Sequence, residues 1–405
     1  MSDEKDLVPR LRFPEFQNQK AWEDKTLLDV CDITNGKSNA QDHIVDGLYP
    51  LFDRSAVIKA SNSFLFDCEA VIIPGEGMRF VPKYYTGKFD LHQRAYALIN
   101  FNCNGLFVYF SVVCNSNLLS IKAVQSTVLS LRLPILQSFQ IQIPHDELEQ
   151  QKIADCLSSL DELIAAHTEK LTALKTYKKG LMQQLVPAEG ETVPKLRFKE
   201  FEGSGDWEIR PLSKLIKSLD AGVSVNSGDR PAIENEVGIL KTSCVTNDFF
   251  EPIENKVVYE RAEKDRLREP VTGDTIIISR MNTPALVGAN AYVQTGLNNI
   301  FLPDRLWAAK AKLGTNMKFV AHVLGSKNGR KALSELASGT SGSMKNIAKS
   351  DVLDMRIAIP NFLEQQKIAD CLSSLDNLIT KQTENIAALK GHKKGLMQGL
   401  FPAVN

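Results

Sequence analysis

Basic and aromatic side chains gather in one stretch of the N-terminal half, "EGMRFVPKYYTGKFDLHQRAY" (Glu76–Tyr96). Basic groups can neutralise phosphates, aromatic rings can stack or wedge between bases, and Arg or Gln can read base edges through two hydrogen bonds. The interleaving therefore suggests contact with nucleic acid. The candidate residues of this stretch are Arg79, Lys83, Tyr84, Tyr85, Lys88, Gln93 and Arg94.

A second set of polar residues is spread over short segments of the C-terminal half that also carry glycine and small hydroxyl residues. The segment 209–360 holds 21 Lys and Arg against 16 Asp and Glu, a difference of 21 − 16 = +5, whereas 24–144 is neutral. Small neighbours let backbone N–H groups approach phosphates. Taken alone, each of the two sets is more typical of a solvated loop face. The candidates here are Lys241, Thr242, Arg280, Asn282, Arg305, Lys345 and Asn346.

Residues for catalysis or metal binding show no such clustering. No G-x-G-x-x-G, G-x-S-x-G or H-E-x-x-H motif occurs, and the Asn-Pro-Pro-Tyr type of motif that amino-methyltransferases use is absent. "NGKS" (Asn35–Ser38) lacks the upstream glycine of a phosphate-binding loop and is interpreted as a turn. The six histidines lie far apart in the sequence. We therefore expect no enzyme, no catalytic residue, no metal site and no cofactor bound by this chain.

The elements that carry these residues follow a duplicated plan. "LEQQKIADCLSSLD" occurs at Leu148–Asp161 and again at Leu363–Asp376, and "KKGLMQ" occurs at Lys178–Gln183 and Lys393–Gln398, all at one offset of 215. Upstream, "VPRLRFPEF" (Val8–Phe16) returns as "VPKLRFKEF" at an offset of 185, and a Trp-Glu pair follows in both copies. The chain is therefore two tandem copies of one plan.

Each repeated C-terminal element predicts a long helix of roughly 40 residues, or about 60 Å. Its apolar positions alternate steps of four and three, which is typical of a coiled-coil seam. Pairing of the two copies in antiparallel fashion is the economical way to bury both seams, with parallel pairing or another chain as alternatives. The seam residues are Ile153, Leu157, Leu160, Ile164, His167, Leu171, Leu174, Lys178, Leu181 and Leu185, and in the second copy Ile368, Leu372, Leu375, Ile379, Gln382, Ile386, Leu389, Lys393, Leu396 and Leu400.

His167 and Gln382 occupy the same seam position in the two copies. A polar residue in such a seam fixes the register of the helix pair. A metal-binding or catalytic role for His167 is the alternative interpretation.

The predicted fold class is α+β, with two divergent mixed α/β domains separated by two long antiparallel coiled-coil helices in an internal pseudo-twofold repeat. The divergent segments share little beyond the closing strands "IQIP" and "IAIP". Short β-branched runs such as "AVIIP" and "DTIIIS" between turn residues predict their strands. The expected boundaries are 1–23 for the N-terminal frame, 24–145 for domain one, 146–186 for the first long helix, 187–208 for a linker and second frame, 209–361 for domain two, and 362–405 for the second long helix.

Composition places the 405 residues with globular chains, since 43% are hydrophobic and 24% are charged. There is no apolar run of about 18 residues, and the charged start "MSDEKDLVPR" does not look like a secretory signal. The seven cysteines form no C-x-x-C pair, which argues against a disulfide framework and a zinc knuckle. These features predict a cytoplasmic protein with no membrane contact.

With these elements in place, the sequence resembles the specificity subunits of type I restriction–modification enzymes over nearly its whole length. The resemblance rests on the "VPKLRF" openings, on "IPHDELEQQKIADCLSSLDELI" and "IPNFLEQQKIADCLSSLDNLI", and on the ends "KKGLMQQLVP" and "KKGLMQGLFP". Inside the divergent segments, "GLYPLFDRSAV" (Gly47–Val57) and "ILKTSCVTNDFF" (Ile239–Phe250) look like parts of two varieties of target recognition domain.

The resemblance implies that the chain binds double-stranded DNA, with each domain reading one half of a bipartite, asymmetric site. It also implies that the helices set the unread spacer and recruit two copies of an adenine-methyltransferase modification subunit and a motor-nuclease restriction subunit. S-adenosylmethionine, ATP and Mg are then expected on those partners. One departure is that "QSTVLSLRLP" (Gln125–Pro134), with Arg132 as its one basic residue, stands where domain two has the small-residue turn "SGSMKNIAKS".

Two other classes of function remain to be weighed. A twin-domain protein-binding scaffold that dimerises through its helices fits the duplication, but it does not explain polar, basic loops in both domains. An enzyme with an unrecognised site needs convergent acid/base or metal ligands, which the sequence does not present.

Overall fold

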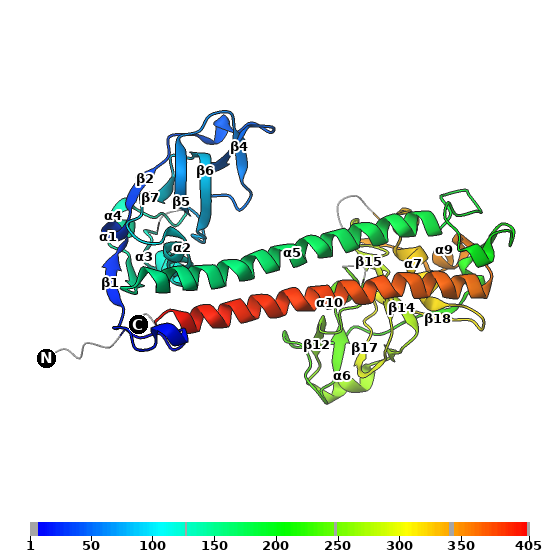
Figure 1. The fold of residues 1–405 in the computed structure, drawn as a ribbon. Helices are drawn as coiled ribbons and strands as arrows, with labels where there is room; N and C mark the ends of the chain where they lie inside the picture. The colour runs from blue at the N-terminus through cyan, green and yellow to red at the C-terminus, as the bar shows by residue number, and fades with distance from the viewer. Residues whose placement is uncertain (1–6, 126–127, 247–248, 340–343, 403–405) are drawn as a thin grey trace. The chain divides into compact units, whose positions relative to one another are not determined.

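The computed structural model describes residues 7–125, 128–246, 249–339 and 344–402. The chain divides into two compact units, Met1–Glu169 with Thr383–Asn405, and Lys170–Gln382 (Figure 1). Each unit has its own hydrophobic cores. The division cuts both long helices, so each unit combines segments that are distant in the sequence. The boundaries expected above follow chain order and stay a prediction.

A six-stranded sheet forms the first unit: β2 (Asp32–Asn35), β3 (Tyr49–Phe52), β4 (Lys59–Ser61), β5 (Phe66–Pro74), β6 (Lys83–Leu91) and β7 (Ala95–Ile99). The order is β2-β7-β5-β6-β3-β4, antiparallel except for the parallel pair β3 and β6. Successive residues of β5 point to opposite faces, with Val71 and Ile73 in one core and Ala70 and Ile72 in the other. The sheet is therefore buried on both faces along β5.

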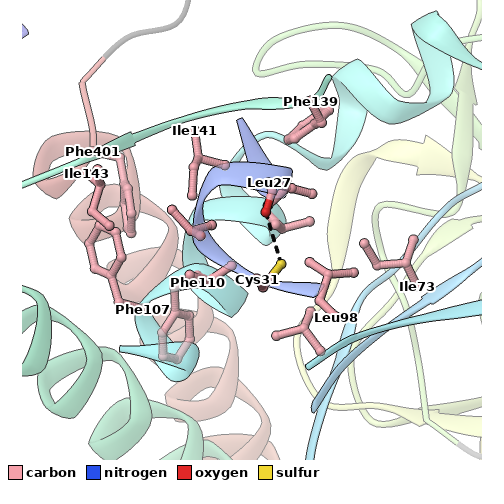
Figure 2. Packing of buried hydrophobic residues seen from close by; sticks show 14 of the residues in the cluster. Leu27, Cys31, Ile73, Leu98, Phe107, Phe110, Phe139, Ile141, Ile143 and Phe401 are labelled. Carbon is pink, nitrogen blue, oxygen red and sulfur yellow. Dashed lines mark hydrogen bonds between the residues drawn. The ribbon is translucent and has the colours of Figure 1, made fainter. Parts of the chain in front are cut away.

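Four short helices complete the first unit: α1 (Leu27–Val30), α2 (Gly105–Cys114), α3 (Ser116–Lys122) and α4 (Leu133–Gln137). Figure 2 shows Phe107 of α2 beside Ile143 and Phe401 in the core on one face of the sheet. No single helix in the described residues is long and apolar enough to span a membrane. The bent pair α2 and α3 meets criteria of length and composition together, and both helices contribute to this core.

Two four-stranded sheets form the second unit. The first has the order β10-β18-β14-β16 and the second β12-β11-β17-β13, beside a two-stranded ribbon, β15-β19. Ile276 and Ile278 of β14 lie in one core and Ile277 in another, again by strand alternation. The strands are β10 (Ile216–Ala221), β11 (Gly238–Leu240), β12 (Asn255–Val257), β13 (Pro270–Val271), β14 (Thr275–Ser279), β15 (Met281–Asn282), β16 (Asn290–Val293), β17 (Leu297–Phe301), β18 (Leu306–Ala311) and β19 (Lys345–Asn346). The helices are α6 (Arg261–Arg266), α7 (Met317–Gly325), α8 (Lys327–Glu335) and α9 (Lys349–Asp354).

A two-stranded ribbon closes the globular part of each unit in the same way. In the first unit β1 (Glu23–Thr26) pairs with β8 (Gln140–Ile143), and in the second β9 (Glu208–Pro211) pairs with β20 (Arg356–Ile359), both antiparallel. In each copy the strand after the repeated tryptophan therefore meets the strand before the long helix. The 3-10 turns of the chain lie at Pro14–Phe16, Ala40–Asp42, Lys199–Phe201, Leu212–Lys214 and Thr242–Val245.

The two long helices, α5 (Glu147–Leu185) and α10 (Phe362–Leu400), contain 39 residues each. In the first unit Lys393 of α10 contacts Asp161 of α5 at 2.5 Å, and in the second Lys178 of α5 contacts Asp376 of α10 at the same distance. The start of each helix thus lies beside the end of the other (Figure 1), which confirms the expected antiparallel pair. Every predicted seam position is buried or half-buried along both helices.

Candidate functional site: two divergent surfaces on a duplicated frame

A buried carboxylate at the start of α5 joins the opening segment of the chain to the long helix. Arg12 donates from Nε and Nη2 to the two oxygens of Glu149, both at 2.7 Å. The indole Nε1 of Trp22 donates to the same carboxylate at 3.3 Å. The Arg12 side chain is 6% exposed and that of Glu149 1%. Two charge-assisted bonds of this geometry are strong and directional, so they fix the opening segment against the helix.

The second unit repeats this arrangement with the equivalent residues. Arg197 donates from Nε and Nη2 to Glu364, both at 2.8 Å, and Trp207 Nε1 donates to it at 3.3 Å. The hydrogen bonds to Glu364 raise the pKa of the Arg197 guanidinium. The repeated Arg, Trp and Glu of the sequence are therefore one structural device, present once in each unit.

The next two residues of the repeat, Gln150 and Gln151, bind the globular domain. Gln150 donates from Nε2 to the carbonyl oxygen of Pro144 at 3.0 Å and accepts from the backbone N–H of Asn104 at 3.0 Å. The Asn104 side chain caps α2 by accepting from Phe107 N–H at 2.8 Å, and its Nδ2 donates to Gln151 at 2.6 Å. One asparagine thus starts a domain helix and ties it to α5.

Asn316 does the same in the second unit. It caps α7 by accepting from Phe319 N–H at 3.0 Å, its backbone N–H donates to Gln365 at 3.3 Å, and its Nδ2 donates to Gln366 at 3.0 Å. Sequence reasoning missed both asparagines. A signal was present, because "NGLFV" and "NMKFV" share the pattern N-x-x-F-V within otherwise unlike segments.

The end of each long helix receives the opening segment of the other copy. Leu11 N–H donates to the carbonyl oxygen of Gly399 at 2.8 Å, and Leu196 N–H donates to that of Gln184 at 2.9 Å. A Cβ atom at Gly399 would lie 2.5 Å from Leu11 Cδ1, the end of a flexible side chain, and the repeat-equivalent Gln184 carries a Cβ at the same contact. Each unit therefore contains an opening segment, a domain, the start of one helix and the end of the other.

Four of the seven domain-one candidates lie on β6 and have structural contacts. Lys83 Nζ donates to the Ser55 carbonyl at 2.6 Å, and burial lowers the pKa of Lys83. Tyr84 donates from its hydroxyl to Glu69 at 2.7 Å. Tyr85 packs against Phe52 and Phe89, and Lys88 lies over the Phe64 ring. These four residues line the sheet, and Lys88 is the exposed one among them.

The other domain-one candidates, Arg79, Gln93 and Arg94, are exposed on loops at the ends of β5, β6 and β7. Arg94 donates to Glu76 at 2.8 Å, and Arg54 contacts the same carboxylate at 3.9 Å. Both arginine side chains are more than 60% exposed. The structure therefore adds Arg54 to the candidate surface, a residue that sequence reasoning missed because it lies outside the aromatic stretch.

The domain-two candidates fall into three groups. Lys241 contacts Glu254 at 3.2 Å, and hydrogen bonds from Ser243 and Lys241 lower the pKa of Glu254. Thr242 begins the adjacent 3-10 turn. Arg305 is exposed, whereas Asn282 is buried and donates to Ser279.

The third domain-two group consists of Arg280, Lys345 and Asn346. Lys345 and Asn346 form β19, which pairs with β15 directly after Arg280. Lys345 Nζ donates to the Gly339 carbonyl at 2.9 Å. Arg280 and Asn346 line the same cavity. Domain one carries "QSTVLSLRLP" where domain two carries "SGSMKNIAKS". Parts of these loops, Ser126, Thr127 and residues 340–343, lie outside the described residues.

Comparison with known proteins decides the family. Residues 19–176 and 205–390 match the family described as "Type I restriction modification DNA specificity domain". The chain belongs to this family. It is a type I restriction–modification specificity subunit with two target recognition domains, which is a DNA-recognition component and not an enzyme.

Similar proteins include two curated specificity subunits. The chain is 24% identical over 315 residues to the type I restriction enzyme MjaVIII specificity subunit of Methanocaldococcus jannaschii, covering 73% of this chain and 69% of that one. It is 27% identical over 165 residues to the EcoDI specificity subunit of Escherichia coli, covering 41% and 37%. The sequence resemblance to specificity subunits is thus confirmed.

Solved structures share the fold. The S subunit of a type I restriction–modification system from M. genitalium superposes with a TM-score of 0.69 at 14% identity, over 98% of this chain and 100% of that one. A chain from a study of complex assembly and conformational transition of the type I R-M system gives a TM-score of 0.51 at 14% identity, over 94% and 98%. In the described residues, no group of three or more His, Cys, Asp or Glu side chains is placed to hold a metal ion.

Proposed function

We propose that each target recognition domain of this specificity subunit reads one half of a bipartite DNA site and that the α5–α10 pair sets the spacer between the halves. The observation that carries this proposal is that both units contain the same hydrogen-bonded groups, Arg–Trp–Glu and Asn–Gln–Gln, whereas the sheets of their domains differ. We call these repeated groups and the long helices the frame. A repeated frame that carries two different domains suits the recognition of two different DNA sequences. The subunit would act in the cytoplasm, together with its DNA.

The two halves of the site should differ, so that the complete site is asymmetric. Domain one presents a six-stranded sheet and domain two presents two four-stranded sheets. Their polar loops also differ: Arg54, Arg79 and Arg94 are exposed in the first, whereas Arg280 and Asn346 line a cavity in the second. Identical domains would read a palindrome, since a twofold protein reads a twofold site.

Exposed residues on the long helices support the recruitment of two copies of one partner. A stripe on α5 contains Leu148, Lys152, Asp155, Ser159 and Leu163, and its equivalent on α10 contains Leu363, Lys367, Asp370, Ser374 and Leu378, identical at every position. We call these the first and second stripes. The leucines at the two ends of the stripes are 43–71% exposed.

Folding alone does not require identity at exposed positions. After the stripes the exposed positions are mixed: Ala166 and Tyr177 differ from Lys381 and His392, whereas Glu169 and Lys175 recur as Glu384 and Lys390. Lys152 contacts Glu15, and Lys367 contacts Glu200 in the second unit. The identity of the two lysines is therefore explained by contacts within each unit. The leucine side chains cannot form such ion pairs, and identical exposed leucines fit two copies of the same modification subunit. A motor-nuclease subunit would complete the restriction enzyme.

The DNA-reading proposal is tested by the pattern of adenine methylation in a cell. The chain is deleted while its modification subunit is kept, and methylation across the genome is compared with that of the parent cell. Loss of one gapped, asymmetric motif is the expected result, and it reports both half-sites and the spacer. If no motif depends on the chain while the modification subunit is active with another specificity subunit, the proposal fails.

The recruitment proposal is tested by the stoichiometry of the assembled complex. Leu148→Glu with Leu163→Glu should remove one modification subunit, Leu363→Glu with Leu378→Glu the other, and all four changes both. Tyr177→Glu, at an exposed position outside the stripes, is the matched control. Native mass spectrometry counts the subunits, and an unchanged count of two in the fourfold variant would contradict the proposal.

A further inference from the structure

A cavity of about 560 Å³ opens on the second domain, with walls from β10, β18, β19 and the residue that follows β14. Its charged side chains are Asp220, Glu269, Arg280 and Lys349. The indole of Trp307 forms another part of the wall. A concave site with a few convergent polar groups on a largely preformed wall is typical of ligand recognition.

The backbone of the arginine in this cavity is held by two hydrogen bonds, and its side-chain Nε has no hydrogen-bond partner in the described residues. Arg280 N–H donates to the Arg305 carbonyl at 3.0 Å, and the Arg280 carbonyl accepts from Ile347 N–H at 2.9 Å. The guanidinium lies 5.4 Å from the centroid of the Trp307 ring. Its Nε is buried and finds no hydrogen-bond partner among the atoms that the structure describes. This cation–π contact orients the guanidinium, and the Nε donor stays unpaired.

The two carboxylates of the cavity are already neutralised by a separate cation. Lys310 Nζ contacts Glu269 at 2.7 Å and Asp220 at 3.1 Å. Arg280 makes no ion pair with either carboxylate in the described structure. The positive charge of Arg280 is thus not neutralised by the carboxylates of its own cavity.

An unpaired acceptor accompanies this unpaired donor. Asn346 is fixed through its backbone, because its N–H donates to the Ser338 carbonyl at 3.0 Å and its carbonyl accepts from Ser338 N–H at 2.9 Å. Its side-chain oxygen Oδ1 is buried without a partner in the described part of the chain. A buried polar group left unpaired costs about 1–3 kcal/mol. Two of them in one cavity indicate a ligand that supplies an acceptor and a donor.

Both A·T and G·C base pairs present an acceptor and a donor on the major-groove edge, and an arginine favours G·C because guanine O6 and N7 are its commonest partners. Guanine accepts at O6 and N7, and cytosine donates from its N4 amino group. We propose that Arg280 and Asn346 read one G·C base pair in the half-site of the second domain, with Arg280 donating to guanine and Asn346 Oδ1 accepting from cytosine. The assignment rests on the DNA-reading function proposed above and names the base pair that this cavity recognises.

The test uses the complex of the full chain with its modification subunits and a set of DNA duplexes. The duplexes carry each of the four base pairs at every position of the second domain's half-site, and kcat/KM for adenine methylation is measured on each. The wild type should require G·C at one position at least. Arg280→Ala should reduce the preference for G·C at that position by about 5- to 150-fold, with every other position unchanged.

Conservative variants separate base reading from a structural role. Arg280→Lys keeps the charge but lacks the planar pair of donors, so it should lose the guanine preference while keeping affinity for non-specific DNA. Asn346→Asp keeps the acceptor and should retain the preference for cytosine on the opposite strand, whereas Asn346→Leu should lose it. Arg261→Ala removes an exposed arginine of the same domain and should change no preference.

Three results would overturn the assignment: a half-site without a specified G·C pair, an Arg280→Ala variant with unchanged preferences, or an equal loss on all duplexes, which marks a phosphate contact. Failure of the wider function looks different. In that case wild-type methylation would show no sequence requirement that depends on this chain.

Discussion

At the scale of single residues, the buried carboxylates Glu149 and Glu364 explain why the opening segments and the helix starts are repeated together. Each carboxylate is 1% exposed and receives three hydrogen bonds, two from an arginine and one from a tryptophan. A buried charge is tolerated only when it is paired and hydrogen-bonded. The arginine, the tryptophan and the glutamate therefore act as a set, although the glutamate lies far from the other two in the sequence.

Removing the arginine should destabilise the first unit strongly. Arg12→Ala leaves Glu149 buried without its cation, and loss of one partner of a buried ion pair costs about 3–5 kcal/mol. Hydrogen exchange of β1 and β8 in the full chain measures the local opening free energy. Arg10→Ala, at an exposed position of the same segment, should change it by less than about 0.5 kcal/mol. Equal effects of the two substitutions would contradict the structural role assigned to Glu149.

His322 on α7 should make the second unit sensitive to acid. Burial, together with the charges of Lys178 and Lys318, lowers the pKa of His322 to about 3 from the ordinary value of 6.5. The unfolded chain takes up a proton below pH 6.5 and the folded chain does not until about pH 3. The contribution of the neutral His322 to the free energy of unfolding is therefore fully present above pH 6.5, and it falls as the pH drops from 6.5 toward 3.

Because of this histidine, the free energy of unfolding of the second unit should be lower at pH 5 than at pH 7 by up to about 2 kcal/mol. His322→Gln should remove that part of the pH dependence, measured by hydrogen exchange of α7 in the full chain at the two pH values. His43→Gln, at an exposed position of the first unit, is the control and should leave it intact. A His322→Gln variant that is as acid-sensitive as the wild type would show that His322 titrates normally in the folded chain.

At the scale of elements, the two long helices are paired by equivalent ion pairs. Lys178 with Asp376 and Lys393 with Asp161 occupy repeat-equivalent positions, and the lysines are 15–20% exposed in both pairs. A lysine in a seam specifies register at a cost in stability, and a carboxylate at the opposing position offsets part of that cost. These pairs therefore favour one antiparallel register over alternatives shifted by a turn.

A double-mutant cycle on Lys178 and Asp376 should give a coupling free energy of about 0.5–1 kcal/mol, because the aspartate is 43% exposed and solvent screens the pair. Reversing both charges, Lys178→Asp with Asp376→Lys, should restore most of the stability lost in either single change. The opening free energy of the adjoining helix turns, from hydrogen exchange, is the measurement. Zero coupling would mean that the apolar seam alone sets the register.

At the scale of the whole molecule, the frame makes the two domains interchangeable in principle. Each domain brings an asparagine that caps one of its own helices and binds the glutamine pair of a long helix. The long helices offer the same Glu-Gln-Gln to either domain. A domain moved to the other position would find the same hydrogen-bonding partners.

Exchanging segment 27–139 with segment 212–355 should therefore reverse the order of the two half-sites and leave the spacer unchanged. Both segments are bounded by the β1–β8 and β9–β20 ribbons, so the frame stays intact. Genome-wide adenine methylation in cells that carry the exchanged chain reports the motif. As a control, the exchanged chain with Asn104→Ala should lose methylation at the rearranged motif, since that domain loses its cap and its tie to the helix. A motif in the original order would contradict the mounting role of the frame.

Periodicity and repetition in the sequence were enough to predict the α+β class, the duplication, the two helices and their seams. These features depend on residues within a few helical turns of one another, so a one-dimensional pattern contains them. His167 and Gln382 fall on the less exposed stripe as the 4–3 spacing predicts. The residue types of the divergent segments also pointed to DNA recognition, which the family match shows.

Only the tertiary structure decided which of the candidate residues meet. Arg12 and Glu149 are 137 positions apart, and Arg197 and Glu364 are 167 apart. Tyr84 is tied to Glu69 across the sheet, whereas Arg280 and Asn346 come together at one cavity. Contacts of this kind depend on strand order and on the packing of helix ends against distant segments. No local pattern specifies them, because hydrophobic burial is non-directional and the hydrogen-bond partners are chosen only once the chain is folded.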